Sequence, residues 1–308
     1  MNLYLPEGFT PSGGYTSVFL EKARVSGKIL EGKVVLCDND HNLYVDLGCM
    51  RGLIKRDAAA IGVRDGSVRD IAVLSRVNKQ SCFVVEGFMN VNGERIAVCN
   101  REKAQREALG YFLETLCPGD IINAKITHLE RFGAFADIGC GNVGLINIEN
   151  ISVSRISHPK DRFYVGQRIK TVVKSIDKEA ERFTLSHKEL LGTWEENAAQ
   201  FSVGQTVSGI IRSIEEYGVF VELTPNLAGL AEIKNIPFEI REGDLCTVYI
   251  KNIIPDKMKI KLNLIDCFPF SGERVSEYKY FIDKGNIKNF VYSPAAAMKR
   301  VATEFMSC

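Results

Sequence analysis

Apolar and polar residues alternate over short stretches of this chain, as they do in half-buried β-strands. Residues 133–138 are one such stretch. Its inward positions are Ala134, Ala136 and Ile138. On the opposite face Phe135 lies beside Asp137, so a large aromatic shares the side that a carboxylate marks as facing solvent. Phe132 is a second aromatic close by, separated from the strand by a glycine.

The same pattern occurs twice more. In residues 217–223, Phe220 shares its face with Glu222, and Tyr217 precedes the glycine. In residues 43–47, Tyr44 shares its face with Asp46. The corresponding inward positions are Val219, Val221 and Leu223 in one stretch and Leu43, Val45 and Leu47 in the other. A single exposed aromatic needs no explanation, but three at equivalent places indicate a repeated feature.

A sequence shift confirms that the chain repeats itself. A shift of about 85 residues places Phe132 on Tyr217, and Gly133, Phe135 and Gly144 on Gly218, Phe220 and Gly229. After a shorter loop the match resumes at an offset of about 77 residues, where residues 182–186 meet residues 259–263. A more diverged first copy aligns residues 41–44 with 132–135, 52–55 with 144–147 and Arg95 with Arg182.

Each copy predicts five short strands rich in β-branched residues. In the middle copy they fall at about 120–129, 133–138, 143–147, 168–177 and 182–187. Five strands in about 70 residues, with no long helix to cover a flat sheet, are best satisfied by a small closed barrel such as the OB-fold. The predicted fold class is therefore all-β, with three tandem five-stranded OB-fold barrels.

These patterns divide the chain into seven parts. They are a loose N-terminal segment (1–23), a diverged barrel (24–104), a helical connector (105–117), the best-matching barrel (118–190), a second helical connector (191–202), a third barrel (203–266) and a C-terminal extension (267–308). Trp194 recurs with Leu190, Ala198 and Phe201 at helical spacing, which favours packing over base stacking. Ser293 followed by Pro294 predicts the start of a short helix in the C-terminal extension.

Composition restricts the function only loosely. The 308 residues are 45% apolar and 25% charged, as in an ordinary globular protein. No apolar run is long enough to span a membrane, and the first residues lack the features of a signal peptide. Nine scattered cysteines, an odd number without a CxxC pair, favour reduced thiols over disulfides or zinc. A cytoplasmic protein, with a monomer favoured, is expected.

The outward aromatics predict a nucleic-acid surface. Flat rings on a small barrel let bases stack with little sequence preference, each worth about 1–3 kcal/mol. Arg182, Lys259 and Arg95 occupy the same outward position in the three copies, where they are placed to hold a phosphate or a base edge. In the middle copy Lys125, Lys170 and Lys174 are expected to assist.

The unit resembles the S1 RNA-binding domain, an OB-fold. The resemblance rests on five segments of the middle copy, at residues 132–135, 144–146, 165–167, 176–177 and 182–188. It implies an RNA-binding face formed by Phe132, Phe135, Asn147, Asp177 and Arg182. Asn147 replaces the family's histidine, Glu232 replaces it in the third copy, and the first copy has His41 and Lys55 with Tyr44 as its one aromatic.

Charge ranks the three copies. The net charge of the whole chain is only +1, so affinity for a polyanion must come from local patches. Residues 25–104 carry 12 basic and 10 acidic groups, residues 119–190 carry 11 and 9, and residues 204–266 carry 7 and 9. The middle copy keeps both its aromatics and a basic balance, so we expect it to be the main RNA contact.

The leading hypothesis is a non-enzymatic protein that binds single-stranded RNA. The resemblance implies mRNA binding, association with the small ribosomal subunit and a role in translation. The predicted RNA-binding residues are Phe132, Phe135, Asn147, Asp177, Arg182, Lys125, Tyr217, Phe220, Lys259, Tyr44, Lys55 and Arg95. No catalytic residue, metal site or cofactor is expected. The GxGxxG match at residues 139–144 precedes another strand instead of a helix, which argues against a dinucleotide site.

Two alternatives stay open. The barrels, above all the third copy with residues 267–308, are alternatively a docking module for a ribosomal or transcription partner. The chain is otherwise an accessory to an RNA-processing enzyme, although no catalytic domain is recognisable in it. Salt dependence separates the first alternative from RNA binding, because phosphate neutralisation releases counterions.

Overall fold

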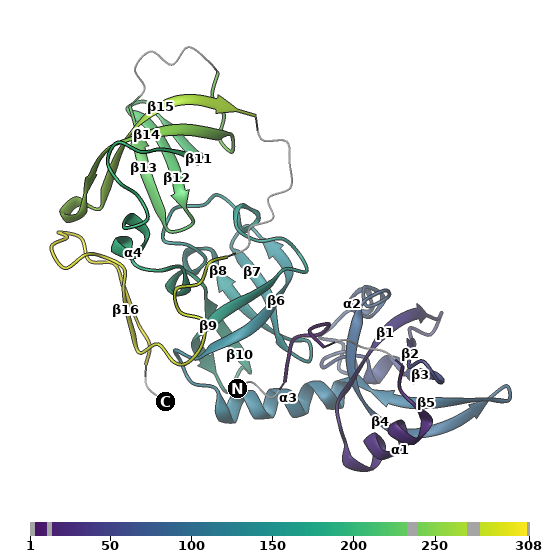
Figure 1. Cartoon of the computed structure of the whole chain (residues 1–308). Helices are drawn as coiled ribbons and strands as arrows, with labels where there is room; N and C mark the ends of the chain where they lie inside the picture. The colour runs from purple at the N-terminus through teal and green to yellow at the C-terminus, as the bar shows by residue number, and fades with distance from the viewer. Residues whose placement is uncertain (1–3, 11–13, 233–238, 270–277, 307–308) are drawn as a thin grey trace.

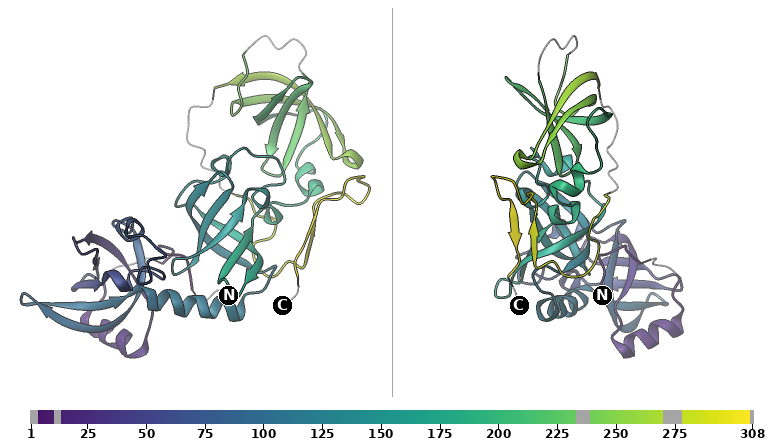
Figure 2. Two further views of the ribbon diagram at one scale, coloured as in Figure 1. Left: turned by 180° about the vertical axis from the view of Figure 1, so that it is seen from behind. Right: turned by 60° about the vertical axis from the view of Figure 1, so that its left-hand side comes forward.

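A computed structural model describes residues 4–10, 14–232, 239–269 and 278–306 of the chain. The described residues form three closed five-stranded barrels and one two-stranded sheet. The barrels follow one another in a bent row, the first at the lower right of Figure 1 and the third at the top. The left view of Figure 2 shows the same row from behind. The all-β fold class of three tandem barrels is confirmed.

The three barrels share one topology. In each, the third strand of the barrel pairs in parallel with the fifth, and the other neighbours are antiparallel. The first barrel comprises β1 (Leu30–Cys37), β2 (Leu43–Asp46), β3 (Arg51–Ile54), β4 (Gln80–Val91) and β5 (Glu94–Asn100). The second comprises β6 (Ile121–Glu130), β7 (Gly133–Gly139), β8 (Asn142–Asn147), β9 (Arg168–Asp177) and β10 (Arg182–Ser186). The third comprises β11 (Thr206–Glu215), β12 (Gly218–Thr224), β13 (Leu227–Ala231), β14 (Leu245–Ile254) and β15 (Lys259–Phe268).

The inward positions of the alternating pattern form the barrel cores. Ala134, Ala136 and Ile138 are fully buried, as are their counterparts in the other two barrels except Leu223, which is half-buried. The opposite face differs from the prediction at two carboxylates. Asp137 and Glu222 are only 2% and 6% exposed, although both lie on the outer face of their strands. A preceding part of the chain covers each of them, which alternation within one strand does not reveal.

Helices connect and flank the barrels. The α-helices are α1 (Ser17–Ser26), α2 (Asp70–Leu74), α3 (Arg101–Thr115) and α4 (Trp194–Ala198). The 3-10 helices are η1 (Arg56–Ala58), η2 (Ile148–Asn150), η3 (Pro159–Asp161), η4 (Lys188–Leu191) and η5 (Pro255–Lys257). In α3 the side chain of Asn100 caps the first turn by accepting from the Lys103 amide at 2.8 Å. Trp194 is 3% exposed and packs in the core shared by the second and third barrels.

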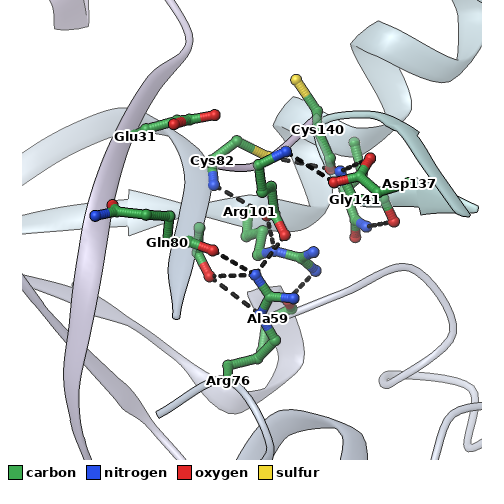
Figure 3. A network of polar contacts seen from close by, with 12 residues as sticks. Glu31, Ala59, Arg76, Gln80, Cys82, Arg101, Asp137, Cys140 and Gly141 are labelled. Carbon is green, nitrogen blue, oxygen red and sulfur yellow. Dashed lines mark hydrogen bonds and ion pairs between the residues drawn. The ribbon is translucent and has the colours of Figure 1, made fainter. Parts of the chain in front are cut away.

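The N-terminal segment is ordered where the structure describes it, contrary to the prediction. Glu7 is buried and joins the first two barrels. Its carboxylate accepts from the Cys82 amide at 3.0 Å and from Arg101 at 2.9 Å, and it pairs with Arg76. Its amide donates to Asp137 at 2.8 Å. Figure 3 shows this network, in which Arg76 and Arg101 approach from different elements. The Pro, Gly and Ser content of this segment predicts a loose chain, and contacts with residues so distant in the sequence cannot be predicted from composition.

The predicted C-terminal helix is wrong. Residues 294–297 make a single turn, and the chain instead forms the hairpin of β16 (Asn289–Val291) and β17 (Ala302–Glu304). The hydroxyl of Ser293, expected to cap a helix, accepts from the Val301 amide at 2.7 Å across the hairpin. Phe290, Tyr292 and Phe305 are buried against the core shared by the second and third barrels. Tertiary burial therefore outweighs the weak tendency of a short segment to form a helix.

The cysteines also depart from the prediction at one position. The described thiols at positions 37, 49, 82, 99, 140, 246 and 267 are free, whereas Cys117 is disulfide-bonded.

Candidate nucleic-acid interface

The aromatic pair of the middle barrel stands at the tight turn between β6 and β7. Phe132 is the second of two turn residues, and its side chain is 55% exposed. Phe135 follows on the outer face of β7 and is half-buried. The two ring centroids are 6.0 Å apart and the rings are perpendicular. One ring thus supports the other, and an exposed aromatic surface faces solvent.

Gly133 allows this turn to pack closely on β8. A Cβ atom at this position would lie 2.4 Å from the carbonyl oxygen of Ile146. The Phe132 carbonyl accepts from the amide of Ile148 at 2.9 Å, which fixes the turn from the other side. The residue beside the exposed ring is therefore glycine because the backbone of the neighbouring strand leaves no room for a side chain.

Strand register places further side chains in line with Phe135. His128 on β6 and Leu145 on β8 lie opposite Phe135, and Thr184 on β10 lies opposite Leu145. The His128 ring is tilted by 32° to the Phe135 ring, with centroids 6.3 Å apart. We call the outer surface formed by Phe132, Phe135, His128, Leu145, Asn147 and Thr184 the aromatic platform.

Three of these residues, His128, Leu145 and Thr184, were absent from the prediction. Simple alternation from Ile126 assigns His128 to the barrel interior. A β-bulge between Ile126 and His128 shifts the register and turns the histidine outward. A polar side chain at an inward position was the available sequence signal. Leu145 is an ordinary apolar residue, so its place on the outer face depends on the strand pairing.

Three predicted polar residues belong to the platform or lie on the strands beside it. Asn147 pairs with Gly133 across β7 and β8, and its side-chain amide makes no hydrogen bond within the described residues. Arg182 and Asp177 are exposed and face each other on β10 and β9. The Asp177 carboxylate accepts from the Ala180 amide at 3.0 Å, so it holds the turn between these strands. The Arg182 guanidinium has no ion-pair partner among the residues described.

The three lysines predicted to assist are engaged within the protein. Lys125 donates to the carbonyl of Glu7 at 2.9 Å, beneath the N-terminal segment. Lys170 donates to the Asp283 carbonyl at 2.5 Å, and Lys174 donates to the Asn150 side chain at 2.9 Å. Their outward direction was inferred correctly, but other segments of the chain cover that side of the barrel. Arg182 is thus the one predicted cation of this barrel that is exposed and makes no ion pair with a described residue.

The third barrel repeats the aromatic geometry of the second. Tyr217 is 65% exposed, and its ring lies perpendicular to that of Phe220 with centroids 6.2 Å apart. Lys259 is exposed at the start of β15, where Arg182 stands in the second barrel. The third barrel therefore presents a second aromatic pair, in a more acidic setting.

The corresponding residues of the first barrel are less available. Arg95 pairs with Glu21 of α1, and its guanidinium lies 4.3 Å from the centre of the Phe88 ring. The Tyr44 hydroxyl donates to Asp38 at 3.4 Å, and the ring is half-buried. Lys55 is exposed just before η1. These residues do not form an aromatic pair like those of the other barrels.

The described residues contain neither a metal-binding cluster nor a candidate membrane span. No group of three or more His, Cys, Asp or Glu side chains there could hold a metal ion. No described helix is long and apolar enough to cross a membrane.

The family of the middle barrel follows from its sequence and topology together. Residues 116–188 match the model of the S1 RNA-binding domain. Residues 116–188 belong to the S1 RNA-binding domain family. The match covers β6 to β10 and therefore every element that carries the aromatic platform. We refer to this barrel as the S1 domain.

Similar proteins extend the relationship beyond the S1 domain. The small ribosomal subunit protein bS1 of Staphylococcus aureus (strain COL) is 34% identical over 264 residues, which cover 82% of this chain and 65% of that protein. The bS1 protein of Chlamydia muridarum is 33% identical over 161 residues, or 49% of this chain and 28% of that protein. This chain thus spans less than two thirds of the length of these relatives.

One solved structure is weakly similar to this chain. It is a multidomain protein with nucleic acid binding domains from Streptococcus pneumoniae, 13% identical, with a TM-score of 0.25. The match covers 78% of this chain and 73% of that one.

Proposed function

We propose that this protein binds single-stranded RNA on the aromatic platform of its S1 domain and does not catalyse a reaction. The observation that carries the proposal is the perpendicular pair of Phe132 and Phe135, exposed on the outer face of a barrel that belongs to an RNA-binding family. Bases stack on such rings with little sequence preference. Asn147 is placed to hydrogen-bond a base or a ribose, and Arg182 to hold a phosphate.

We further propose that the protein acts in translation, in the cytoplasm, together with the small ribosomal subunit and mRNA. The relatives named small ribosomal subunit protein bS1 support this part. The third barrel adds a weaker RNA contact through Tyr217 and Phe220. Linking a weak site to a stronger one raises the overall affinity when one strand reaches both.

A salt titration tests RNA binding against protein docking. Fluorescence anisotropy with an unstructured oligouridylate of about 12 nucleotides, within the range of OB-fold site sizes, gives the dissociation constant. Between about 50 and 200 mM salt the affinity should fall steeply, with a logarithmic slope of about −0.7 for each phosphate neutralised on a single strand. If no RNA is retained even at the lowest salt concentration, docking replaces RNA binding as the function.

Cosedimentation tests the ribosomal part separately. The purified protein should sediment with small ribosomal subunits in a sucrose gradient. The Phe132→Ala, Phe135→Ala double variant should show whether the same surface is required. Absence of the wild-type protein from the subunit fraction would contradict the ribosomal role and leave the RNA-binding proposal standing.

A further inference from the structure

A cleft of about 710 Å³ lies between the first barrel and the S1 domain. One wall is formed by residues 59–79 of the first barrel, a second by α3, and the third by the S1 domain. Its lining includes the side chains of Arg76, Lys79, His128, Asp137, Val143 and Glu181. Glu7 and Arg101 lie at its base, where the N-terminal segment joins the two barrels.

The cleft is continuous with the aromatic platform. His128 lines the cleft, and its ring also lies against Phe135 of the platform. Val143, 47% exposed, lines the cleft from β8, two residues before Leu145 on the same face. His128 and Phe135 lie opposite each other on neighbouring strands. An RNA strand that stacks on Phe135 therefore lies one strand away from the lining of the cleft.

Lys79 is the cation placed to meet such a strand. It is exposed, and its ammonium makes no ion pair or hydrogen bond with a described residue. Partial burial lowers the pKa of Lys79, and the nearby charges of Arg76 and Lys125 lower it further, while the charge of Glu7 opposes them without reversing the direction. An anion at this position would relieve that repulsion between cations.

The carboxylates of the cleft do not supply that anion. Glu7 is occupied by Arg76 and Arg101, and Asp137 accepts from the backbone amides of Glu7, Gly139 and Gly141. Glu181 is exposed on the turn between β9 and β10, and it makes no ion pair with Lys79. Lys79 therefore makes no direct ion pair with a described residue, and the Glu7 charge that attracts it is already shared by Arg76 and Arg101.

We propose that this cleft is a second subsite for the RNA strand on the platform, in which Lys79 holds a backbone phosphate. The inference rests on the proposed function of the platform. It makes the RNA site composite, because the first barrel contributes the cation and the S1 domain contributes the stacking surface. It also sets a direction, since the bound strand continues from the platform toward the first barrel.

The test measures binding of the oligouridylate to the Lys79→Gln variant of the full chain across the salt series. We expect a loss of about two- to fivefold in affinity at low salt, as for an exposed charge pair. The logarithmic salt slope should become shallower by about 0.7, because one fewer phosphate is neutralised. Lys79→Arg should restore the wild-type slope.

Lys22→Gln is the matched control, since Lys22 is exposed on α1 of the first barrel and does not line the cleft. Equal slopes for Lys79→Gln and Lys22→Gln would overturn the subsite. The Phe132→Ala, Phe135→Ala variant separates the two proposals. If it binds like the wild type, the platform is wrong and the composite site fails with it. If it binds weakly while the two lysine variants have equal slopes, the platform stands and the cleft alone is wrong.

Discussion

Arg162 of the S1 domain donates a hydrogen bond to Glu222 of the third barrel at 2.6 Å, and both side chains are buried. Glu222 also accepts from Arg212 of its own barrel at 2.5 Å. Glu222 and Asp137 hold the same position in their two barrels, next to the outward aromatic. Each is covered by a preceding part of the chain, so the same strand position is used twice as a joint between barrels.

Removing Glu222 should weaken the second joint strongly. In Glu222→Ala the buried Arg162 guanidinium loses this carboxylate, and Arg212 keeps only its 4.0 Å approach to Asp161. Breaking a buried ion pair by removing one partner typically costs about 3–5 kcal/mol. Trp194 is buried in the core shared by the second and third barrels, so its fluorescence during urea unfolding reports on this part of the chain. Glu215→Ala removes an exposed carboxylate from the same barrel and should leave the transition unchanged. Equal midpoints for the two variants would show that the ion pair contributes little.

The glycine beside the exposed ring should be required for the turn. Gly133→Ala places a Cβ against the Ile146 carbonyl, so β7 and β8 must move apart. We expect a loss of about 1–3 kcal/mol in stability, as in other overpacked sites, together with weaker RNA binding. Gly110→Ala is the control, because a Cβ there meets nothing within 4 Å on the exposed side of α3. That variant should be more stable by about 0.5–1 kcal/mol.

The first joint should make stability depend on pH. Burial and the charge of Glu7 raise the pKa of Asp137 from 3.8 to about 7. The folded protein therefore binds this proton more tightly than the unfolded chain, so its contribution to stability falls as pH rises from about 4 to 7. Asp137→Asn should gain stability relative to the wild type across that window. Thermal unfolding of both proteins at several pH values measures the difference.

The stability of Asp137→Asn must be compared with that of the wild type at each pH, because His187 changes stability with pH in the opposite direction. Burial lowers the pKa of His187 to about 3, so its contribution to stability falls as pH decreases below about 6.5. His187 is present in both proteins and cancels in the comparison. A difference that stays constant between pH 4 and 7 would mean that Asp137 does not titrate in this window.

Features that depend on contacts within a single barrel were mostly predicted from the sequence. Alternation and repetition located the strands of the middle barrel to within one or two residues, and they identified the aromatic pairs of the second and third barrels. These features are local, because side-chain direction in a strand has a period of two and the turn glycine is visible beside the ring.

What the sequence did not predict depends on contacts between distant segments. Lys125 and Asp137 point outward, as expected, but the N-terminal segment covers both. Arg95 is drawn to Glu21 of α1, and the C-terminal hairpin forms because Phe290 and Phe305 are buried against neighbouring elements. His128 faces outward because of a bulge that simple alternation does not include.

The central claim is that Phe132 and Phe135 stack RNA bases. Anisotropy with the oligouridylate at fixed low salt tests it through the Phe132→Ala, Phe135→Ala double variant. Loss of two stacking surfaces, each worth about 1–3 kcal/mol, should weaken binding at least about tenfold while thermal unfolding stays cooperative. Phe268→Ala, which removes a 51% exposed ring from the third barrel away from its aromatic pair, should bind like the wild type. An affinity of the double variant equal to that of the wild type would contradict the account.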